Sequence, residues 1–319
     1  MRFLNRAAVG LFTALVLLFA TAPFAAAEDA KAPARLYAAP TGPNETESAN
    51  LELRDEARDK QLRLRVTWPK AKDSASDSAG KLPVIVYSHG AGGSCDAYTP
   101  LIECWASHGY VVIQPTHGDS ISLLSAEERR EITSAQDFLR SPNVLLQAMA
   151  RPEDIRFVID SLAKIEEEIP ALKGKLDAAR LGMGGHSYGA HTTQLISGLS
   201  LRGLLGRRRK AEDARPKALL MISPQGTGRT IDAESFTGIT RPVLMITGSE
   251  DDSPTGQPAS WRLEAWEHFP AGEKFLLFIE GAHHNFGGIS GVRYPGAGRD
   301  NPEHVDWVRT TSLAFWDAY

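Results

Sequence analysis

The sequence predicts an α/β fold, with a mostly parallel central sheet covered by helices on both faces. Short runs that are apolar at every position or at all but the last, such as Val84–Tyr87, Ala218–Ile222 and Val243–Thr247, predict strands that are buried on both faces. Amphipathic helical patterns follow several of these runs, and this alternation is typical of parallel sheets. A glycine-flanked serine, Ser187, stands between one such strand and its helix.

Length and composition are those of a globular protein with a sizeable core. The chain has 319 residues, is 42% hydrophobic and 23% charged, and carries a net charge of -4. This mildly acidic balance does not favour nucleic-acid binding. The basic run Arg207–Lys210 is followed by Glu212 and Asp213, so we interpret it as a solvated loop within a charged surface segment, residues 199–216.

The first residues resemble a targeting segment. Arg2 and Arg6 precede the apolar run Leu11–Ala20, and Ala25–Ala27 offers a small-residue cleavage site. We therefore predict a signal peptide over residues 1–27, export to the periplasm or medium, and no stable membrane span after cleavage. The alternative is an uncleaved anchor, because the apolar stretch is nearly long enough to span a bilayer.

Residues 28–50 are rich in Ala, Pro and small polar residues, which predicts a flexible leader. The folded domain is then expected over residues 51–319. Its first strands should be Leu51–Arg54 and Leu62–Trp68. In the second, apolar residues alternate with polar ones, which predicts a strand with one wet face at an antiparallel edge of the sheet.

The next elements follow from buried runs and helix signals. After Val84–Tyr87, a helix should begin near Pro100 with Thr99 as its N-cap, followed by the strand Tyr110–Gln114. A helix is predicted over Arg151–Ile165, with Pro152 in its first turn. The intervening residues 115–150 are expected to cross the top of the sheet and cover a substrate pocket.

The central motif is Gly185-His186-Ser187-Tyr188-Gly189. It lies between the strand-like run Arg180–Gly184 and the helix-like run Ala190–Ile196. A serine on such a tight turn needs small neighbours, because the helix packs closely against the strand. Gly185 and Gly189 meet that need, so we predict that Ser187 is a nucleophile exposed above the sheet.

The remaining elements complete the alternation. Pro258–His268 should be a helix, and Phe275–Ile279 should be the last strand. A final helix should open at Asn301-Pro302. Its predicted inner face consists of Val305, Val308, Ser312 and Phe315.

A serine hydroxyl needs a base, and the base needs a third group that orients it. In parallel sheets such groups gather at the carboxyl ends of strands. Asp251 and Asp252 follow the strand Val243–Thr247, and we favour Asp251 while spacing leaves Asp252 open. His283 and His284 follow the last strand, and we favour His284 as the base.

An acyl-transfer site also needs donors for the oxyanion. The backbone N–H of Tyr188 is one candidate. The glycine-rich loop His89–Gly93 suggests the N–H of Ala91 as the other. His89 and His186 are interpreted as loop supports, and His117 as a loop residue or a pocket residue.

No cofactor or metal is expected. The sequence contains no P-loop, no dinucleotide-binding fingerprint and no set of cysteines and histidines with metal-ligand spacing. The two cysteines, Cys95 and Cys104, flank the start of a predicted helix. In an oxidising compartment they could form a disulfide, or they could remain buried thiols.

Several motifs in this order resemble the α/β-hydrolase superfamily: SHGAGGS, ASHGYVVIQPTHGDS, RPEDIRFVIDSL, GHSYGA, TGSEDD and GAHHNF. Within it, the chain is similar to exported dienelactone-hydrolase-like esterases related to platelet-activating-factor acetylhydrolases. The resemblance covers Leu51 to the C-terminus. It implies the α/β-hydrolase fold, with Ser187 as nucleophile, His284 as base, Asp251 as acid, and Ala91 and Tyr188 as oxyanion donors. Dienelactone hydrolases carry a cysteine nucleophile, so the serine here favours ordinary esters.

The sequence thus predicts a serine hydrolase that cleaves small-molecule or lipid-like carboxylic esters. The same triad could cleave amides or peptides. A third hypothesis is a catalytically silent relative that only binds. Neither the acyl group, the alcohol group nor the oligomeric state follows from the sequence.

Overall fold

The computed structural model describes residues 2–5, 41–70, 80–132, 134–203, 206–293 and 297–319. The rest of the predicted signal segment and the leader up to residue 40 lie outside the described residues. No helix within the described ranges is long and apolar enough to cross a bilayer.

Within the described part of the chain, nine strands form one sheet in the order β1-β11-β10-β9-β6-β4-β5-β3-β2. The strands are Arg2–Asn5 (β1), Thr46–Asp55 (β2), Lys60–Pro69 (β3), Leu82–Ser88 (β4), Val111–Pro115 (β5), Leu176–His186 (β6), Ala218–Ile222 (β9), Val243–Glu250 (β10) and Lys274–His283 (β11). The strands from β11 to β5 are parallel, whereas β1, β2 and β3 are antiparallel at the two edges.

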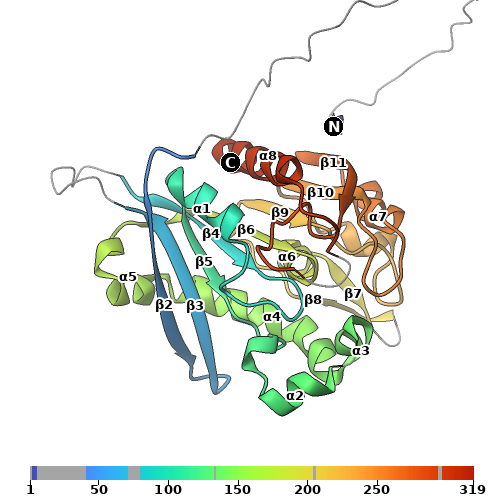
Figure 1. The fold of residues 1–319 in the computed structure, drawn as a ribbon, viewed down its shortest axis with the longest axis horizontal. Helices are drawn as coiled ribbons and strands as arrows, with labels where there is room; N and C mark the ends of the chain where they lie inside the picture. Colours follow the sequence, from blue (N-terminus) through green and yellow to red (C-terminus); the bar gives the residue numbers. More distant parts are fainter. Residues whose placement is uncertain (1, 6–40, 71–79, 133, 204–205, 294–296) are drawn as a thin grey trace, which may run out of the picture.

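Helices cover both faces of this sheet (Figure 1). They are Thr99–Ser107 (α1), Ala126–Glu131 (α2), Ala135–Arg140 (α3), Pro142–Asp160 (α4), Leu162–Glu168 (α5), Tyr188–Ser197 (α6), Ser260–His268 (α7) and Pro302–Ala318 (α8). The predicted fold class, a mostly parallel sheet between layers of helices, is confirmed.

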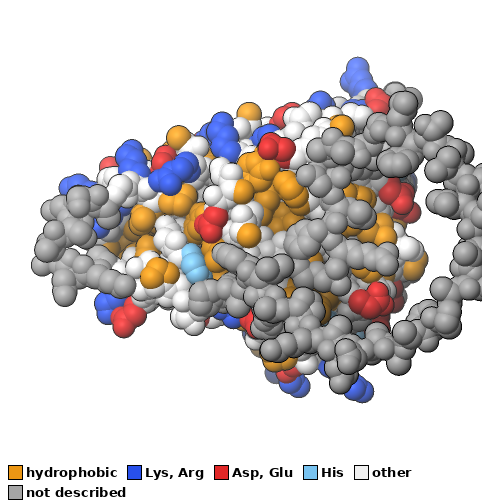
Figure 2. Space-filling model, turned by 90° about the horizontal axis from the view of Figure 1, so that it is seen from above, with side chains coloured by type: hydrophobic (Ala, Val, Ile, Leu, Met, Phe, Trp, Pro, Cys, Tyr) orange, Lys and Arg blue, Asp and Glu red, His pale blue; other side chains and the backbone are white. Residues whose placement is uncertain are grey.

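The core consists of two apolar clusters, one on each side of the sheet. Because side chains alternate along a strand, Val84 and Val86 enter one cluster while Ile85 and Tyr87 enter the other. The first cluster packs against α4, α5, α6 and α7, and the second packs against α1 and α8. On the molecular surface seen from above, Figure 2 shows exposed hydrophobic side chains near the middle of the view, with Lys and Arg mainly toward its outline.

Three boundary predictions were wrong. Residues 46–50, expected in the leader, form the first half of β2, because Thr46–Asn50 pair with the partner residues Arg65–Pro69. An edge strand tolerates small polar residues there. The helix α1 starts at Thr99 rather than being capped by it, and its N-cap residue is Tyr98 in a left-handed conformation.

The helix predicted from Arg151 begins nine residues earlier, at Pro142. Ser141 caps it through a hydrogen bond from the Val144 N–H to its hydroxyl, and Pro142 occupies the first turn. Pro152 lies inside the helix, although a proline there removes one helical hydrogen bond. Residues 115–150, the segment expected to cover a pocket, therefore contain α2, α3 and the first half of α4.

Cys95 and Cys104 are both buried and both free, so the disulfide alternative was wrong for this structure. The charged segment, residues 199–216, contains a short antiparallel hairpin of Ser200–Arg202 (β7) and Arg208–Lys210 (β8). Several of its residues are exposed, as predicted.

Candidate active site

Ser187 lies on a sharp turn between β6 and α6. Its backbone has φ 57° and ψ -116°, a strained conformation for a residue with a side chain. A Cβ atom on Gly189 would lie 1.9 Å from the Ser88 carbonyl oxygen, and one on Gly185 would lie 2.4 Å from the Gly189 backbone. Only glycine fits at these two positions, which explains the G-x-S-x-G spacing.

The structure brings Ser187, His284 and Asp251 into one hydrogen-bonded chain. The Ser187 Oγ is 2.9 Å from the His284 Nε2, and the His284 Nδ1 is 2.7 Å from the Asp251 Oδ1. Asp251 is fully buried and His284 nearly so, whereas Ser187 is partly exposed. With Nδ1–H donating to the carboxylate, Nε2 keeps its lone pair for the serine proton.

The neighbouring candidates lie elsewhere. The Asp252 carboxylate accepts a hydrogen bond of 2.8 Å from the Ala259 N–H and so closes the turn before α7. His283 is half exposed and pairs with Glu250, with 2.8 Å between its Nε2 and the glutamate oxygen. Neither side chain takes part in the chain that reaches Ser187.

The second oxygen of Asp251 is held by two hydroxyl groups that the sequence analysis missed. Thr247 Oγ1 donates to Oδ2 over 2.9 Å, and Ser223 Oγ donates to the same atom. Ser223 follows β9 with φ 53°, just as Ser187 follows β6 with a positive φ. These bonds fix the carboxylate, and its other oxygen faces the imidazole.

Arg262 on α7 is a further buried group that the sequence analysis missed. Its Nη2 lies 3.4 Å from the His284 Nδ1, and its Nε lies 3.5 Å from the Asp251 Oδ1. Burial lowers the pKa of His284; Asp251 opposes this and the Arg262 cation adds to it. Although burial opposes ionisation of Asp251, Arg262 and His284 together hold its pKa below the ordinary value. The site therefore favours a neutral imidazole beside an ionised carboxylate.

The two predicted oxyanion donors lie on segments that pack against each other. Tyr188 is the first residue of α6, so its N–H has no acceptor within the helix. The loop after β4 packs on the elbow, because the Ser88 and His89 carbonyls lie against Gly189. Among the described residues, no acceptor contacts the Ala91 N–H.

His186 connects the segment that carries His284 to the loop after β4. Its Nε2 donates to the His284 carbonyl over 2.7 Å, and its Nδ1 accepts from the Tyr98 hydroxyl over 2.9 Å. That hydroxyl in turn accepts from the Gly90 N–H over 3.1 Å. Burial lowers the pKa of His186 to about 3, so the ring stays neutral and keeps this donor–acceptor pattern. The predicted supporting role fits these contacts, but Tyr98 was missed.

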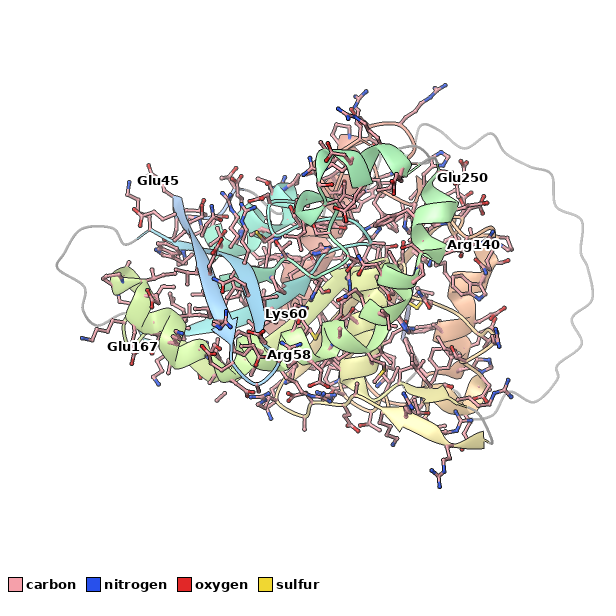
Figure 3. The ribbon with its side chains drawn as sticks, turned by 90° about the horizontal axis from the view of Figure 1, so that it is seen from below. Glu45, Arg58, Lys60, Arg140, Glu167 and Glu250 are labelled. Carbon is pink, nitrogen blue, oxygen red and sulfur yellow. The ribbon has the colours of Figure 1, made fainter. Side chains whose placement is uncertain are left out.

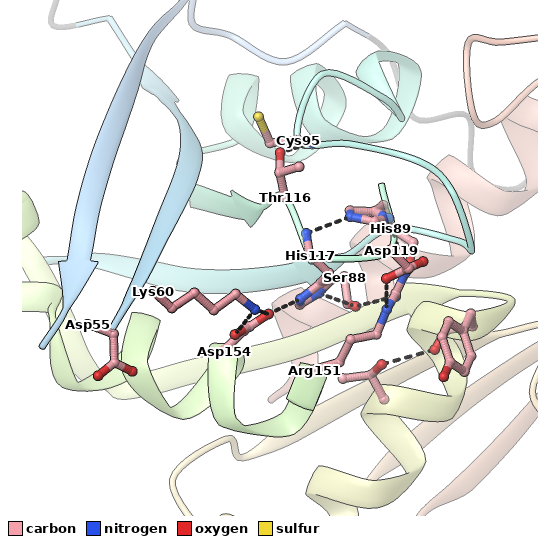
Figure 4. Close-up of polar contacts among 12 residues, drawn as sticks. Asp55, Lys60, Ser88, His89, Cys95, Thr116, His117, Asp119, Arg151 and Asp154 are labelled. Atoms are coloured by element: carbon pink, nitrogen blue, oxygen red, sulfur yellow. Dashed lines mark hydrogen bonds and ion pairs between the residues drawn. The ribbon is translucent and has the colours of Figure 1, made fainter. Parts of the chain in front are cut away.

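A second buried polar cluster lies beside the loop after β4 (Figure 4). His117 is fully buried, so it does not line a pocket. Its Nδ1 lies 2.9 Å from the Asp154 carboxylate and its Nε2 lies 2.9 Å from the Ser88 hydroxyl. Arg151 pairs with Asp119 in the same cluster, with 2.7 Å between Nη2 and Oδ2. The sequence motifs contained these residues, but no local pattern indicated that they meet.

A cavity of about 350 Å³, lined in part by Pro83, Arg180 and Trp316, lies at the amino ends of β4 and β6, opposite Ser187. In the described ranges, no group of three or more His, Cys, Asp or Glu side chains is arranged to hold a metal ion.

Comparison with known proteins gives one family match. The model of the family described as platelet-activating factor acetylhydrolase, isoform II, matches residues 58–203. The chain is 24% identical over 289 residues to the platelet-activating factor acetylhydrolase of Cavia porcellus, covering 80% of this chain and 61% of that protein. It is 30% identical over 164 residues to a provisionally named phospholipase A2 of Schizosaccharomyces pombe (strain 972 / ATCC 24843), covering 39% of this chain and 37% of that protein. The matches thus span less than two thirds of either relative.

The fold has solved neighbours. A provisionally named dienelactone hydrolase from Klebsiella pneumoniae subsp. pneumoniae MGH 78578 superposes with a TM-score of 0.60 at 16% identity, covering 86% of this chain and all of that one. The chain therefore has the α/β-hydrolase fold. The resemblance to dienelactone hydrolases and platelet-activating factor acetylhydrolases, predicted from its motifs, is confirmed.

Proposed function

We propose that this chain is a serine hydrolase that cleaves carboxylic esters. The observation that carries the proposal is the unbroken hydrogen-bonded chain from Ser187 through His284 to Asp251, with the serine on a strained turn. We assign Ser187 as the nucleophile, His284 as the general base and acid, and Asp251 as the group that orients the imidazole.

In the proposed acylation step, the Ser187 Oγ attacks the ester carbonyl carbon while its proton moves to the His284 Nε2. The distance of 2.9 Å between these atoms already suits that transfer. The imidazolium that forms is stabilised by the Asp251 carboxylate. It then returns the proton to the leaving alkoxide as the carbon–oxygen bond breaks.

The carbonyl oxygen carries the negative charge of the tetrahedral intermediate. The N–H groups of Ala91 and Tyr188 are proposed to donate to it. Such preorganised donors stabilise developing charge strongly, because they do not need to reorient during the reaction. Water then attacks the acyl carbon while its proton moves to the His284 Nε2. The bond from that carbon to the Ser187 Oγ breaks, Oγ takes the proton back from His284, and the acid is released.

The substrate class is proposed from the relatives. Their names refer to a phospholipase A2 and to an acetylhydrolase of platelet-activating factor. Lipid-like esters with short acyl groups, such as acetyl, are therefore the first substrates to test. A matched ester and amide pair would separate esterase from amidase activity, since the same triad serves both reactions.

The test is active-site labelling. The purified mature protein is treated with a fluorophosphonate probe beside the Ser187→Ala variant, and ester hydrolysis is measured in parallel. We expect labelling and hydrolysis in the wild type and neither in the variant. If a folded wild type does not react with the probe, the triad is not assembled and a binding role takes precedence.

We further propose that residues 1–27 direct export and are then removed. Cleavage after Ala27 would also remove β1, leaving β11 as an edge of the sheet. The mass of the protein recovered from a secretion-competent host tests this proposal. A mature N-terminus near Glu28 supports it, whereas retention of Met1 in a membrane fraction supports the anchor alternative.

A further inference from the structure

We infer that Arg151 is a positioning residue that fixes the direction of the Ala91 N–H, and that Asp119 holds Arg151 in place. This inference rests on the proposed function, because it concerns the oxyanion donors of the same site. We call Arg151, Asp119 and the loop peptides that they hold the Arg151 clamp.

The guanidinium of Arg151 grips two consecutive peptides of the loop. Its Nη1 donates to the His89 carbonyl over 2.6 Å, and its Nη2 donates to the Gly90 carbonyl over 3.2 Å. The Gly90 oxygen also accepts from the His89 Nδ1 over 2.6 Å and from the Gly93 N–H over 3.2 Å, so Arg151 acts on it together with these two donors. In a trans peptide the C=O and the following N–H lie in one plane and point in opposite directions. Holding the Gly90 carbonyl therefore aims the Ala91 N–H away from Arg151.

The peptides on both sides are also held. The Gly90 N–H donates to the Tyr98 hydroxyl over 3.1 Å, and the Gly92 N–H donates to the Asp119 Oδ2 over 3.1 Å. Between these two anchored donors, the Ala91 N–H contacts no acceptor among the described residues. This pattern leaves one donor available in a loop whose neighbouring peptides cannot turn.

Asp119 meets Arg151 in a two-point contact. Arg151 Nε donates to Oδ1 over 2.8 Å and Nη2 donates to Oδ2 over 2.7 Å. Both side chains are fully buried, and such a pair is stable only while both partners are present. The planar fork of arginine can satisfy the carboxylate and two carbonyls at once, whereas a lysine ammonium cannot match that geometry.

The clamp also supports the second donor. The Arg151 guanidinium lies 4.5 Å from the centre of the Tyr188 ring, and the Tyr188 hydroxyl donates to the Val144 carbonyl over 2.7 Å. Arg151 and Val144 both belong to α4. One helix thus supports both residues whose N–H groups are proposed to bind the oxyanion.

A further layer surrounds the arginine. The Ser88 hydroxyl lies 3.4 Å from Arg151 Nη1 and 2.9 Å from His117 Nε2, and His117 is held by Asp154. Asp154 in turn binds Lys60 and Arg58, which lie side by side near the end of the β2–β3 hairpin (Figure 3). The clamp is therefore anchored through α4 to the edge of the sheet.

The inference can be tested by substituting Arg151 with lysine, and Arg241 offers a matched control. Arg241 also caps backbone carbonyls, those of Asp213, Pro216 and Ile196, at distances from 2.6 to 2.8 Å. It lies before β10, at the opposite ends of the strands from Ser187. Arg241→Lys should disturb packing to a similar degree without affecting the oxyanion loop.

The first readout is kinetic. In Arg151→Lys we expect kcat to fall by about 10- to 100-fold with little change in KM, because a misaimed donor weakens binding of the transition state. The Ki of a trifluoromethyl ketone analogue, whose serine adduct carries an oxyanion, should rise by the same factor as kcat/KM falls. Arg241→Lys should keep both values. An unchanged kcat and Ki in Arg151→Lys, or equal losses in both variants, would overturn the inference.

The second readout does not need activity. Amide hydrogen exchange of the peptide that covers residues 88–95 should become faster in Arg151→Lys and in Asp119→Asn, but not in Arg241→Lys. If the wild type hydrolyses no ester, the proposed function fails, and this exchange measurement alone decides on the clamp. Unchanged exchange in both clamp variants refutes it, whatever the activity.

Discussion

At the scale of single residues, the choice between two adjacent acids depends on turn geometry that sequence spacing does not define. Asp251 and Asp252 follow the same strand, and both are common turn residues. In the structure, Asp251 turns inward to His284, Thr247 and Ser223, whereas Asp252 binds the Ala259 N–H. The two aspartates therefore have different chemical roles despite their shared position in the pattern.

This difference predicts unequal effects of the same substitution. Asp251→Asn should lower kcat by about 10³- to 10⁴-fold, because an amide favours the wrong imidazole tautomer. Asp252→Asn keeps an oxygen that can accept from Ala259, so its kcat should stay within about three-fold of the wild type. Steady-state hydrolysis of one activated ester by both variants measures this. Equal losses in the two variants would contradict the assignment of Asp251.

The burial of His284 should affect how kcat/KM depends on pH. Because burial lowers the pKa of His284, kcat/KM should rise with pH through a midpoint below 6.5, the ordinary value for histidine. The imidazolium cannot accept the serine proton, so activity is lost as pH falls through that midpoint. Replacing Arg262 with Gln removes a nearby cation and should move the midpoint upward.

His283→Gln is the matched control for this profile. His283 pairs with Glu250 at the half-exposed end of the loop, so its loss should leave the midpoint in place. If the midpoint of the pH profile shifted in His283→Gln but not in Arg262→Gln, the titrating group would be His283 and not His284. Circular dichroism at each pH establishes that the variants remain folded during the measurement.

At the scale of elements, the strands were easier to predict than the helix α4. Runs such as Val84–Tyr87 are apolar at every position, and only a strand buried on both faces explains so short a run. The proline at 152 instead suggested a helix start, which the Ser141-Pro142 pair actually provides. Interior packing around Ile155 and the buried Arg151 outweighs the missing hydrogen bond at Pro152.

The elbow is the element whose sequence requirement is strictest. A Cβ on Gly189 would collide with the Ser88 backbone, which belongs to a neighbouring strand and cannot move alone. Gly189→Ala should therefore lower the free energy of unfolding by more than about 3 kcal/mol, or prevent folding. Gly228→Ala is a fair control, because a Cβ there meets nothing within 4 Å. Urea unfolding curves of the two variants measure the difference, and similar midpoints would argue against this packing.

At the scale of the whole molecule, the order of strands explains why the site could be predicted in outline. Parallel strands end at one edge of the sheet, so the residues after β4, β6, β10 and β11 had to meet there. The buried residues that support the loop after β4 could not be predicted in the same way. Arg151 lies on a helix and Asp119 lies on a loop 32 residues earlier, so no helical or strand periodicity in the sequence relates them. Their pairing follows only from how α4 crosses the sheet.

The network around Asp154 couples this architecture to pH. His117, Lys60 and Arg58 all contact its buried carboxylate, and although burial opposes ionisation, these partners lower the pKa of Asp154 to about 2. A depressed carboxyl pKa stabilises the folded state above the unfolded value of about 4, and the stabilisation is lost as pH falls through the folded value. The expected contribution is about 2 kcal/mol.

Asp154→Asn should therefore be less stable than the wild type at neutral pH, and the gap should narrow as pH falls from about 4 to about 2. The difference narrows because the wild-type carboxyl group is then protonated, and so is neutral like the asparagine amide. Asp96→Asn, which removes a half-exposed partner of Arg63, should change stability by less than about 1 kcal/mol at every pH. Chemical unfolding across this pH range tests the prediction. If the difference in stability between the wild type and Asp154→Asn stayed constant with pH, the pKa of Asp154 would be the same in the folded and unfolded states. The network would then stabilise the edge of the sheet through packing alone.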